Sequence, residues 1–595
     1  MAELEVTFPP IPTLDSKGAA SRPTSWRVYV DGGLLDTNVP VTTLSRRYPV
    51  SAYKTYSIQV SLVNELGEGV RSDSTNVSFE QPKGVPSKPG APGVSLILFG
   101  GGVDGGGGSG GSSADWQLDS SRYITSKRTL AIIHPRPDGE TNSFARHRNL
   151  YPSIAYEIPV GVQGGAYPYK FTLTGNTTLP GASIGETLVV SGDTLVEPSD
   201  YGIVNGTAPA SGTYTVEVQV EDQEGSTATV SWQVVTSATP FVFIDAVSGS
   251  NSNAGTLAAP FQTMLALHSD SSATTTYSQK IVYMRGGQHN FVGISGNGNN
   301  YAMFSNNLPT CFLAYPGETP RVDMSGTGWM VINSGGDDAY FSGITWHDNN
   351  TSSGNSMMFV IFGTSRDRIT FFKNTYEDYS VGSGGSSNPS VTYASSQPSS
   401  YFYRSRDTFT GTQGNSLTIY QANDAVIELC EWNSCTFSQT SASNQYGVIY
   451  LKDNPNGVTI RRNKNVGNTW SGMEAVVNCV GQNNGDDVEV CYNWFETDRT
   501  SGQGGAIWDG INNQTLTNGW FYRNTAALRW YSDATTVTCS IEKSLLENGT
   551  HPATGYTITD SVDQMSASDF DADLNLAGTA RTTHLGLRGA EIAGA

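Results

Sequence analysis

Short runs of alternating apolar and polar residues, separated by clusters of turn-forming residues, recur along the chain. The first group lies in residues 24–80, where WRVYV, PVTTL and YSIQVSLVN are separated by the clusters DGG and NELGEG. A second group lies in residues 155–237, and its segment SGTYTVEVQVED alternates regularly from Tyr214 to Val220. Alternation at period two is typical of strands with one buried face. The pattern therefore predicts an all-β chain that begins with two β-sandwiches.

From Phe241 onward the alternation becomes a repeat of paired strands. The segment that follows Phe241 carries Phe261, Met264 and Leu267, which would share one face of a short helix and cover the open apolar end of a stack of coils. One strand type then ends in asparagine (GITWHDN, RITFFKN, ELCEWN, VTIRRN, VEVCYN, GWFYRN), and a second precedes it (MVIN, FVIF, LTIYQ, VIYL, VVNC, AIWDG). A period of roughly 30 residues predicts stacked parallel coils.

The asparagines that end the first strand type are predicted to form a ladder along the stack. They are Asn349, Asn374, Asn433, Asn463, Asn493 and Asn524. Asparagine tolerates the left-handed conformation of a turn, and its amide can bond to the coils above and below. Glu428 and Gly519 depart from this register, because they stand where other copies carry isoleucine or valine.

Alignment on the ladder predicts a surface row on the other strand type. One aligned position holds Ile419, Ile449, Val477 and Trp508. The next position holds Tyr420, Tyr450, Asn478 and Asp509. Because side chains alternate and adjacent coils lie about 4.8 Å apart, the second set would form an outward ladder. The pair Asp486-Asp487 lies in a turn and is interpreted as solvated charge.

Composition marks the segment boundaries. We expect an N-terminal arm (1–23), a sandwich (24–81), a Pro/Gly-rich linker (82–118), a connector plus second sandwich (119–238), the coil stack with its capping helix (239–548) and a closing segment (549–595). In the connector, His134 and His147 are expected to be solvated loop residues.

Charge and residue usage exclude several classes of protein. The 595 residues include 34 basic and 54 acidic ones, a net charge of −20, which disfavours nucleic acid and anionic membranes as partners. No run approaches the roughly 18 apolar residues of a membrane span, and no signal peptide is visible. The six cysteines lack CxxC spacing and are interpreted as small buried hydrophobes, so we expect no metal and no cofactor.

Several segments resemble known families. Tyr56, followed by alternating apolar residues and NELG, resembles a fibronectin type III domain, in which this tyrosine fixes a corner between strands. Residues 155–237 resemble the Ig-like modules of surface and virion proteins. The chain from Phe241 resembles right-handed parallel β-helix proteins of the pectate-lyase-like class, and the stretch that begins at Arg588 resembles their closing segment.

This order of modules resembles bacteriophage tail fibres and tail spikes. The resemblance implies a virion protein assembled in the host cytoplasm, a homotrimer, N-terminal modules bound to other virion proteins, and a host-surface polysaccharide as ligand. The predicted function is attachment to that glycan through the β-helix face. The binding candidates are Tyr420, Tyr450, Trp470, Asn478 and Asp509.

Three other functions stay open. The first is a spike depolymerase, hydrolase or lyase, for which two carboxylates must flank a glycosidic bond. Glu474, Asp509 and Asp453 are its candidate catalytic residues, although nothing in their spacing demands this role. The second is a structural decoration or connector without a ligand, and the third is a secreted bacterial polysaccharide lyase. We favour binding over catalysis.

Overall fold

The computed structural model divides the chain into two compact units, Met1–Ser112 and Ser113–Ala595. In the first unit it describes the backbones of strands alone. The described residues are 2–7, 25–30, 33–40, 45–50, 55–64, 67–68, 75–78, 94–97, 116–118, 120, 123–136, 145–191, 194–267, 280–290, 301–304, 311–324, 329–332, 339–347, 357–362, 368–379, 390–395, 401–413, 415–420, 423–438, 447–452, 455–471, 475–478, 485–496, 505–508, 515–527, 536–547, 556–565, 567–570, 577 and 580.

The described strands of the first unit form two sheets. One has the strand order β3-β2-β5-β6, with β7 also paired to β5, and in the other β1 pairs with β4 and with β8. The strands are β1 (Ala2–Thr7), β2 (Ser25–Val30), β3 (Gly33–Pro40), β4 (Ser45–Val50), β5 (Thr55–Asn64), β6 (Gly67–Glu68), β7 (Thr75–Ser78) and β8 (Val94–Ile97). The residues predicted to be an arm and a linker therefore each supply a strand.

The second unit begins with a β-sandwich. Its main sheets have the orders β10-β19-β18-β13 and β11-β17-β14, and β12-β9 and β15-β16 pair separately. The elements are β9 (Ala131–His134), η2 (Arg146–Arg148), β10 (Asn149–Leu150), β11 (Ala155–Pro159), β12 (Gly161–Gln163), β13 (Lys170–Leu173), β14 (Ser183–Ile184), β15 (Val189–Ser191), β16 (Thr194–Val196), β17 (Ile203–Thr207), β18 (Gly212–Glu221) and β19 (Thr227–Thr236). Along β18, Val216, Val218 and Val220 are buried, as period two predicts.

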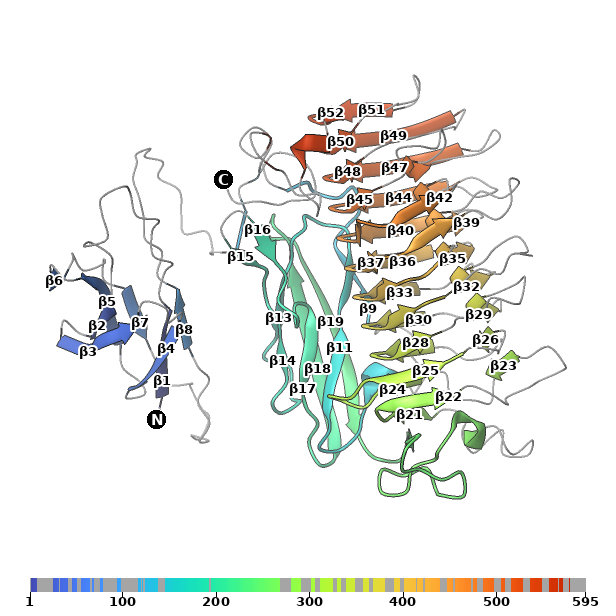
Figure 1. Ribbon diagram of the computed structural model, residues 1–595, viewed down its shortest axis with the longest axis horizontal. Helices are drawn as coiled ribbons and strands as arrows, with labels where there is room; N and C mark the ends of the chain where they lie inside the picture. Colours follow the sequence, from blue (N-terminus) through green and yellow to red (C-terminus); the bar gives the residue numbers. More distant parts are fainter. Residues whose placement is uncertain are drawn as a thin grey trace. The chain divides into compact units, whose positions relative to one another are not determined.

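The remainder is a β-solenoid with three long sheets, named here A, B and C (Figure 1). Sheet A contains β20 (Phe241–Ile244), β21 (Ile281–Met284), β24 (Cys311–Ala314), β27 (Ala339–Ser342), β30 (Arg368–Phe372), β33 (Tyr401–Ser405), β36 (Asn423–Glu428), β40 (Asn456–Arg461), β44 (Gly485–Cys491), β47 (Thr515–Tyr522), β49 (Thr536–Glu542) and β51 (Tyr556–Thr559). Neighbouring strands of this sheet pair in parallel.

Sheets B and C are built in the same way. Sheet B contains β22 (Gly287–Asn290), β25 (Pro320–Asp323), β28 (Thr345–His347), β31 (Thr375–Glu377), β34 (Thr408–Thr410), β37 (Glu431–Asn433), β41 (Lys464–Asn465), β45 (Trp494–Glu496), β48 (Thr525–Ala527), β50 (Leu545–Glu547) and β52 (Val562–Met565). Sheet C contains β23 (Tyr301–Phe304), β26 (Trp329–Ile332), β29 (Met357–Phe362), β32 (Ser390–Ser395), β35 (Asn415–Tyr420), β39 (Gly447–Lys452), β43 (Ala475–Asn478) and β46 (Gly505–Trp508). The predicted all-β fold with a parallel β-helix is confirmed.

Apolar side chains from successive coils stack inside the solenoid. The main inward row of sheet A is Val242, Val282, Phe312, Phe341, Phe371, Arg404, Ile427, Ile460, Val490, Phe521 and Ile541. Phe261 and the ends of η3 (Met264–Leu267) are buried in the same core, although η3 is a single 3-10 turn. The buried Arg404 is an exception in this row, and it donates to Thr392 at 2.7 Å and lies 3.5 Å from Asp407.

From β27 to β47, two residues join each strand of sheet A to the following strand of sheet B, and the second of the two holds a position of the ladder. The residue before each ladder position has a left-handed φ, for example 57° at Arg462 and 56° at Tyr492. The ladder positions are Ile344, Asn374, Asp407, Cys430, Asn463, Asn493 and Asn524. The sequence analysis placed asparagine at the left-handed position of the turn, but asparagine is the residue after it. From there its side-chain amide reaches the turn of the adjacent coil.

Two residues of the predicted ladder are not placed in it. The prediction for Asn433 is wrong, because Cys430 occupies that position and Asn433 is an exposed residue at the end of β37. Asn349 lies outside the described residues, and Ile344 takes the corresponding position. Glu428 does not interrupt the inward row of apolar residues, because its side chain lies on the outer face of sheet A. It is in register with Arg461 there and forms an ion pair with it.

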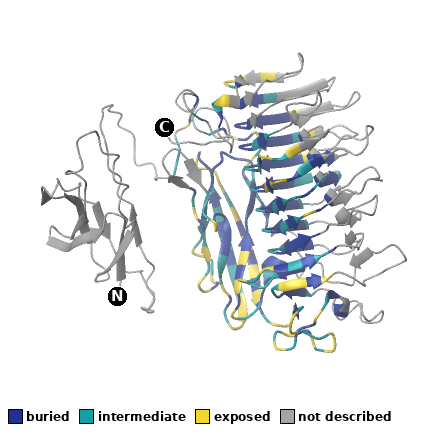
Figure 2. Ribbon diagram, viewed as in Figure 1, coloured by how far each residue is buried: buried dark blue, intermediate teal, exposed yellow. Residues whose placement is uncertain are grey.

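The sandwich lies along the outer face of sheet A, and its long strands run along the stack of coils (Figure 1). Ile133 packs on Tyr403, and Tyr492 joins the core of the sandwich. Figure 2 shows buried residues on both sides of this junction. One of the three sheet faces of the solenoid is therefore closed by the chain itself. Within the described residues, no helix is long and apolar enough to cross a membrane.

Candidate functional site

Strand pairing in sheet C determines which of the predicted binding residues share a row. Tyr450 pairs with Thr418 and with Asn478, and Tyr420 pairs with Lys452. The predicted alignment of Tyr420 with Tyr450 is therefore wrong by two residues. A slip of two keeps every side chain on its face, so the apolar pattern cannot detect it.

The same pairing corrects the end of the predicted row. Asn478 pairs with Trp508, where the sequence alignment had placed Asp509. Tyr450 is 4% exposed, so little of its side chain can meet a ligand directly, whereas Tyr420 is partly exposed. Trp470 lies on β42 (Thr469–Ser471), which pairs with β38 (Thr436–Ser438) outside the three sheets.

The candidate catalytic carboxylates Asp453, Glu474 and Asp509 lie outside the described residues. Among the described residues, no group of three or more His, Cys, Asp or Glu side chains is placed to hold a metal ion. Cys311, Cys430, Cys435 and Cys491 are buried cysteines. The candidate binding sites among the described residues are therefore clefts that are lined by polar side chains.

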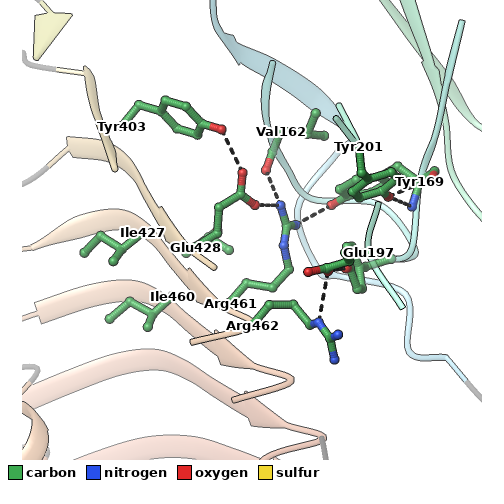
Figure 3. A network of polar contacts seen from close by, with 12 residues as sticks. Val162, Tyr169, Glu197, Tyr201, Tyr403, Ile427, Glu428, Ile460, Arg461 and Arg462 are labelled. Atoms are coloured by element: carbon green, nitrogen blue, oxygen red, sulfur yellow. Dashed lines mark hydrogen bonds and ion pairs between the residues drawn. The ribbon is translucent and has the colours of Figure 1, made fainter. Parts of the chain in front are cut away.

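A buried polar network fastens the sandwich to sheet A (Figure 3). Arg461 pairs with Glu428 and donates to the hydroxyl of Tyr169 at 2.8 Å and to the carbonyl of Val162 at 3.1 Å. The hydroxyl of Tyr403 donates to the second oxygen of Glu428 at 3.0 Å. Burial of this kind raises the pKa of Tyr169 and Tyr403, so both hydroxyls stay protonated. Among the described residues, Nε of Arg461 has no hydrogen-bond partner.

An open groove of about 480 Å³ lies beside this junction, at the start of the strands of sheet A. It is lined by Arg128, Arg136, Tyr401, Asn423, Asp424, Asn456, Gly457 and Asp487. The lining residues of sheet A come from the consecutive strands β33, β36, β40 and β44. We call this feature the axial groove, because it runs across successive coils.

Residues with a left-handed backbone form a row across adjacent strands, and three of them, Asp424, Gly457 and Asp487, form the floor of the axial groove. Asp424, Gly457, Asp487 and Asn518 fall in register on adjacent strands, and their φ values are 49°, 75°, 58° and 55°. Gly457 is the gap in this row: a Cβ there would lie 3.0 Å from Oδ1 of Asp424 and 3.4 Å from Nη1 of Arg128. The floor therefore has one position without a side chain, Gly457, between the carboxylates of Asp424 and Asp487.

The sandwich side supplies two arginines as the wall of the axial groove. Arg128 donates to the carboxylate of Asp487 at 2.8 Å and to its carbonyl at 2.6 Å. Arg136 lies over the ring of Tyr401, with Cζ 4.0 Å from the ring centre. Asp424 accepts a long bond of 3.5 Å from Gln163 and keeps most of its acceptor capacity.

This lining suits a polyhydroxylated ligand. Carboxylates accept from hydroxyl groups, amides both donate and accept, and guanidinium groups donate in a fixed geometry. Because strands of a sheet repeat about every 4.8 Å, a polymer laid along the groove meets a new set of partners at each coil. An extended chain of sugars has both the repeat and the hydroxyl groups that such a surface can bind.

The sequence carried a signal for this groove that the predictions did not use. Three consecutive coils carry a dipeptide of turn-forming residues near the start of the sheet A strand, namely Asn423-Asp424, Asn456-Gly457 and Asp486-Asp487. Of the three, Asp486-Asp487 alone was interpreted from the sequence, as solvated charge in a turn. Their alignment one above another is visible once the strand register is known.

Comparisons with known proteins give no family for this chain. No family model matches it, and no curated protein matches it. Fibronectin(III)-like modules of CbhA from Clostridium thermocellum match at 9% identity over 38% of this chain and 82% of theirs, with a TM-score of 0.12. SGBP-B of a Bacteroides ovatus mixed-linkage glucan utilization locus, solved with a mixed-linkage heptasaccharide, matches at 14% identity over 42% of this chain and 44% of its own, with a TM-score of 0.09. TM-scores this low do not establish a shared fold.

Proposed function

We propose that this protein is an appendage of a bacteriophage virion that binds a surface glycan of the host, and that the glycan lies in the axial groove. The observation that carries the binding proposal is the groove itself, in which carboxylate and amide groups of successive coils face two guanidinium groups of the sandwich side. The order of the modules and the resemblance of the solenoid to spike proteins support the virion assignment. The first unit would then join the protein to the particle.

Binding without cleavage fits the groove better than hydrolysis does. Asp424 and Asp487 stand two coils apart, which is roughly 9.6 Å between backbones at the usual strand spacing. That separation lies at the upper edge of what an inverting hydrolase uses. Asp487 is also held in an ion pair with Arg128, so it is not free to activate a water molecule.

The test adds a side chain at Gly457, the position in the floor of the axial groove that has none. Gly457→Asn introduces a side chain between the two carboxylates, in a backbone conformation that Asn518 already adopts in the same row. We expect wild-type protein to bind members of an array of bacterial surface polysaccharides, and the variant to bind them at least about tenfold more weakly, because the ligand loses the floor of the groove.

Gly467→Asn is the matched control. Gly467 has a φ of 72°, and a Cβ there meets nothing within 4 Å. It carries the same backbone cost without touching the groove, so it should bind as the wild type does. Failure of the wild type to bind any polysaccharide would refute the proposed function, and equal binding by both variants would remove the axial groove as the site. Release of reducing ends during the assay would identify a depolymerase instead.

A further inference from the structure

The two arginines in the wall of the axial groove differ in the groups they bond to. Arg128 donates from Nη2 to Asp487 and from Nη1 to Oε1 of Gln163 at 3.3 Å. Arg136 lines the same groove and is partly exposed, but it has no hydrogen bond and no ion pair to any residue that the structure describes. The fold therefore uses the donors of one guanidinium group and not those of the other.

Tyr401 holds the side chain of Arg136 in place at the surface of the groove. Cζ of Arg136 lies 4.0 Å from the centre of the tyrosine ring, so the ring packs against the guanidinium group. A guanidinium group is planar, and its five N–H groups lie in that plane. Stacking therefore orders the group and leaves its donors available to a ligand. A side chain that is already ordered loses less conformational entropy when the ligand binds.

The other charges of the axial groove restrict where an anion can bind. Asp487 is paired with Arg128 at 2.8 Å. Asp424 lies on β36, the strand that pairs with β33, on which Tyr401 lies. An anionic group is attracted by Arg136 and repelled by Asp424, and adjacent strands lie about 4.8 Å apart. A carboxylate on a bound glycan would therefore lie at Arg136, and the next sugar would present hydroxyl groups to Asp424.

The charge of the whole chain makes a local cation necessary for an acidic ligand. The net charge is −20, which repels an anionic polymer at long range. A preference for acidic sugars would thus have to come from a single well-placed cation, and Arg136 is placed for this in the axial groove.

We propose that the glycan bound in the axial groove contains an acidic sugar, and that Arg136, stacked on Tyr401, binds the carboxylate of that sugar. A guanidinium group matches a carboxylate in geometry and can form two parallel hydrogen bonds with it. The ligand class is then a polysaccharide in which a uronic acid is followed by a neutral sugar. This class of ligand is an addition to the proposed glycan-binding function, on which it rests.

The experiment uses the full chain and the array of bacterial surface polysaccharides that tests the axial groove. Each acidic polysaccharide is printed twice, once as isolated and once after its carboxyl groups have been reduced to hydroxymethyl groups. We expect the wild type to bind at least one acidic polysaccharide, and to bind the reduced form at least about tenfold more weakly, because a charged hydrogen bond is lost. This comparison changes the ligand and not the protein, so it does not depend on the folding of a variant.

Two substitutions of Arg136 connect the preference to this side chain. Arg136→Gln removes the charge, so it should bind the acidic form at least about tenfold more weakly than the wild type does and the reduced form equally well. Arg136→Lys keeps the charge without the planar fork, and its preference for the acidic form should lie between those of the wild type and Arg136→Gln. Both should keep the thermal midpoint of the wild type, since Arg136 makes no hydrogen bond within the described part of the chain.

Arg285→Gln is the matched control. Arg285 also stacks on a tyrosine, with Cζ 4.4 Å from the ring centre of Tyr315, but it pairs with Glu318 at 2.6 Å and does not line the axial groove. The variant should keep the preference of the wild type for the acidic form.

The failure of this proposal can be distinguished from the failure of the proposed function. Equal binding of acidic and reduced forms by the wild type, or binding of neutral polysaccharides alone, would overturn the acidic-sugar assignment and leave the groove as a glycan site. A preference that Arg136→Gln retains, or equal losses for both forms in that variant, would overturn the role of Arg136. Failure of the wild type to bind any polysaccharide would refute the proposed function and the acidic-sugar assignment with it.

Discussion

Two histidines are buried side by side where the sandwich meets sheet A. The ring of His134 stacks on Tyr403 with centroids 5.0 Å apart, and the ring of His147 lies 6.3 Å from that of His134. Burial, aided by the charge of Arg368, lowers the pKa of His134 to about 3, and burial holds that of His147 well below its usual value. Both imidazoles are therefore neutral in the folded protein at neutral pH.

We expect these histidines to make the fold sensitive to mild acid. Because the unfolded chain takes up protons near pH 6.5 and folded His134 does so only near 3, the free energy of unfolding should fall as pH falls through this window. His134 contributes about 1.4 kcal/mol per pH unit. Urea unfolding between pH 7 and 5 measures the slope.

His134→Phe is the informative variant, because it keeps an aromatic ring beside Tyr403 and removes the titrating group. Its stability should fall less steeply with pH than that of the wild type, by about 2 kcal/mol between pH 6.5 and 5. Equal slopes would mean that His134 is protonated in the folded state. The sequence interpretation of both histidines as solvated was wrong. The residues next to His134 in the sequence look like a loop, whereas Thr370, which lies against its ring, is more than 200 residues away.

At the scale of the element, the asparagine ladder joins consecutive coils through side-chain amides. Asn493 donates to the carbonyl of Ile460 at 2.9 Å and to Oδ1 of Asn524 at 3.0 Å, and it accepts from the backbone of Asn463 at 2.9 Å. Its side chain is fully buried. The amide therefore satisfies backbone groups that the turn leaves without partners.

Asn493→Ala should destabilise the protein by about 2–4 kcal/mol, because it leaves several buried donors and acceptors unpaired. Asn433→Ala is the control and should change the stability by less than about 0.5 kcal/mol, since Asn433 is exposed. Thermal unfolding of the two variants decides between the ladder seen here and the one predicted with Asn433 in it. Similar losses in both variants would contradict the observed ladder.

The sequence predicted the strands correctly, because alternation is a local pattern. It did not predict which residues of adjacent coils lie side by side, because that depends on the register between strands. The alternation in β18 and the repeat of paired strands identified the sandwich and the parallel solenoid. The predicted ladder was wrong at Cys430, because the backbone turn defines the position and a cysteine can fill it: its backbone N–H donates to Oδ1 of Asn463. The prediction that Tyr420 and Tyr450 share a row was wrong, because a slip of two residues between the strands preserves the alternation of side chains.

At the scale of the whole second unit, the docking of the sandwich on the solenoid was not foreseen. Its contacts join residues far apart in sequence, such as Arg461 with Tyr169 and Arg128 with Asp487. No local pattern specifies which outer face of the solenoid is covered. The axial groove lies along this junction, so the candidate site depends on a feature that the sequence alone did not reveal.

The pair of Arg461 and Glu428 tests whether the two parts of this unit are fastened by buried charge. Arg461→Leu leaves a buried carboxylate without its cation, which should cost about 3–5 kcal/mol. The double variant Arg461→Leu with Glu428→Leu should be more stable than Arg461→Leu alone, because no unpaired charge remains. Arg321→Leu, at a half-exposed ion pair with Glu377, is the control and should cost less than about 1 kcal/mol.

Urea unfolding measures these free energies, and limited proteolysis between β19 and β20 reports whether the sandwich has come away from the solenoid. Cleavage there should increase in Arg461→Leu and not in Arg321→Leu, because the freed charge draws water into the junction. If the double variant were as unstable as Arg461→Leu alone, apolar replacement would not substitute for the charged pair. The other bonds of Arg461, to Tyr169 and Val162, would then carry the attachment.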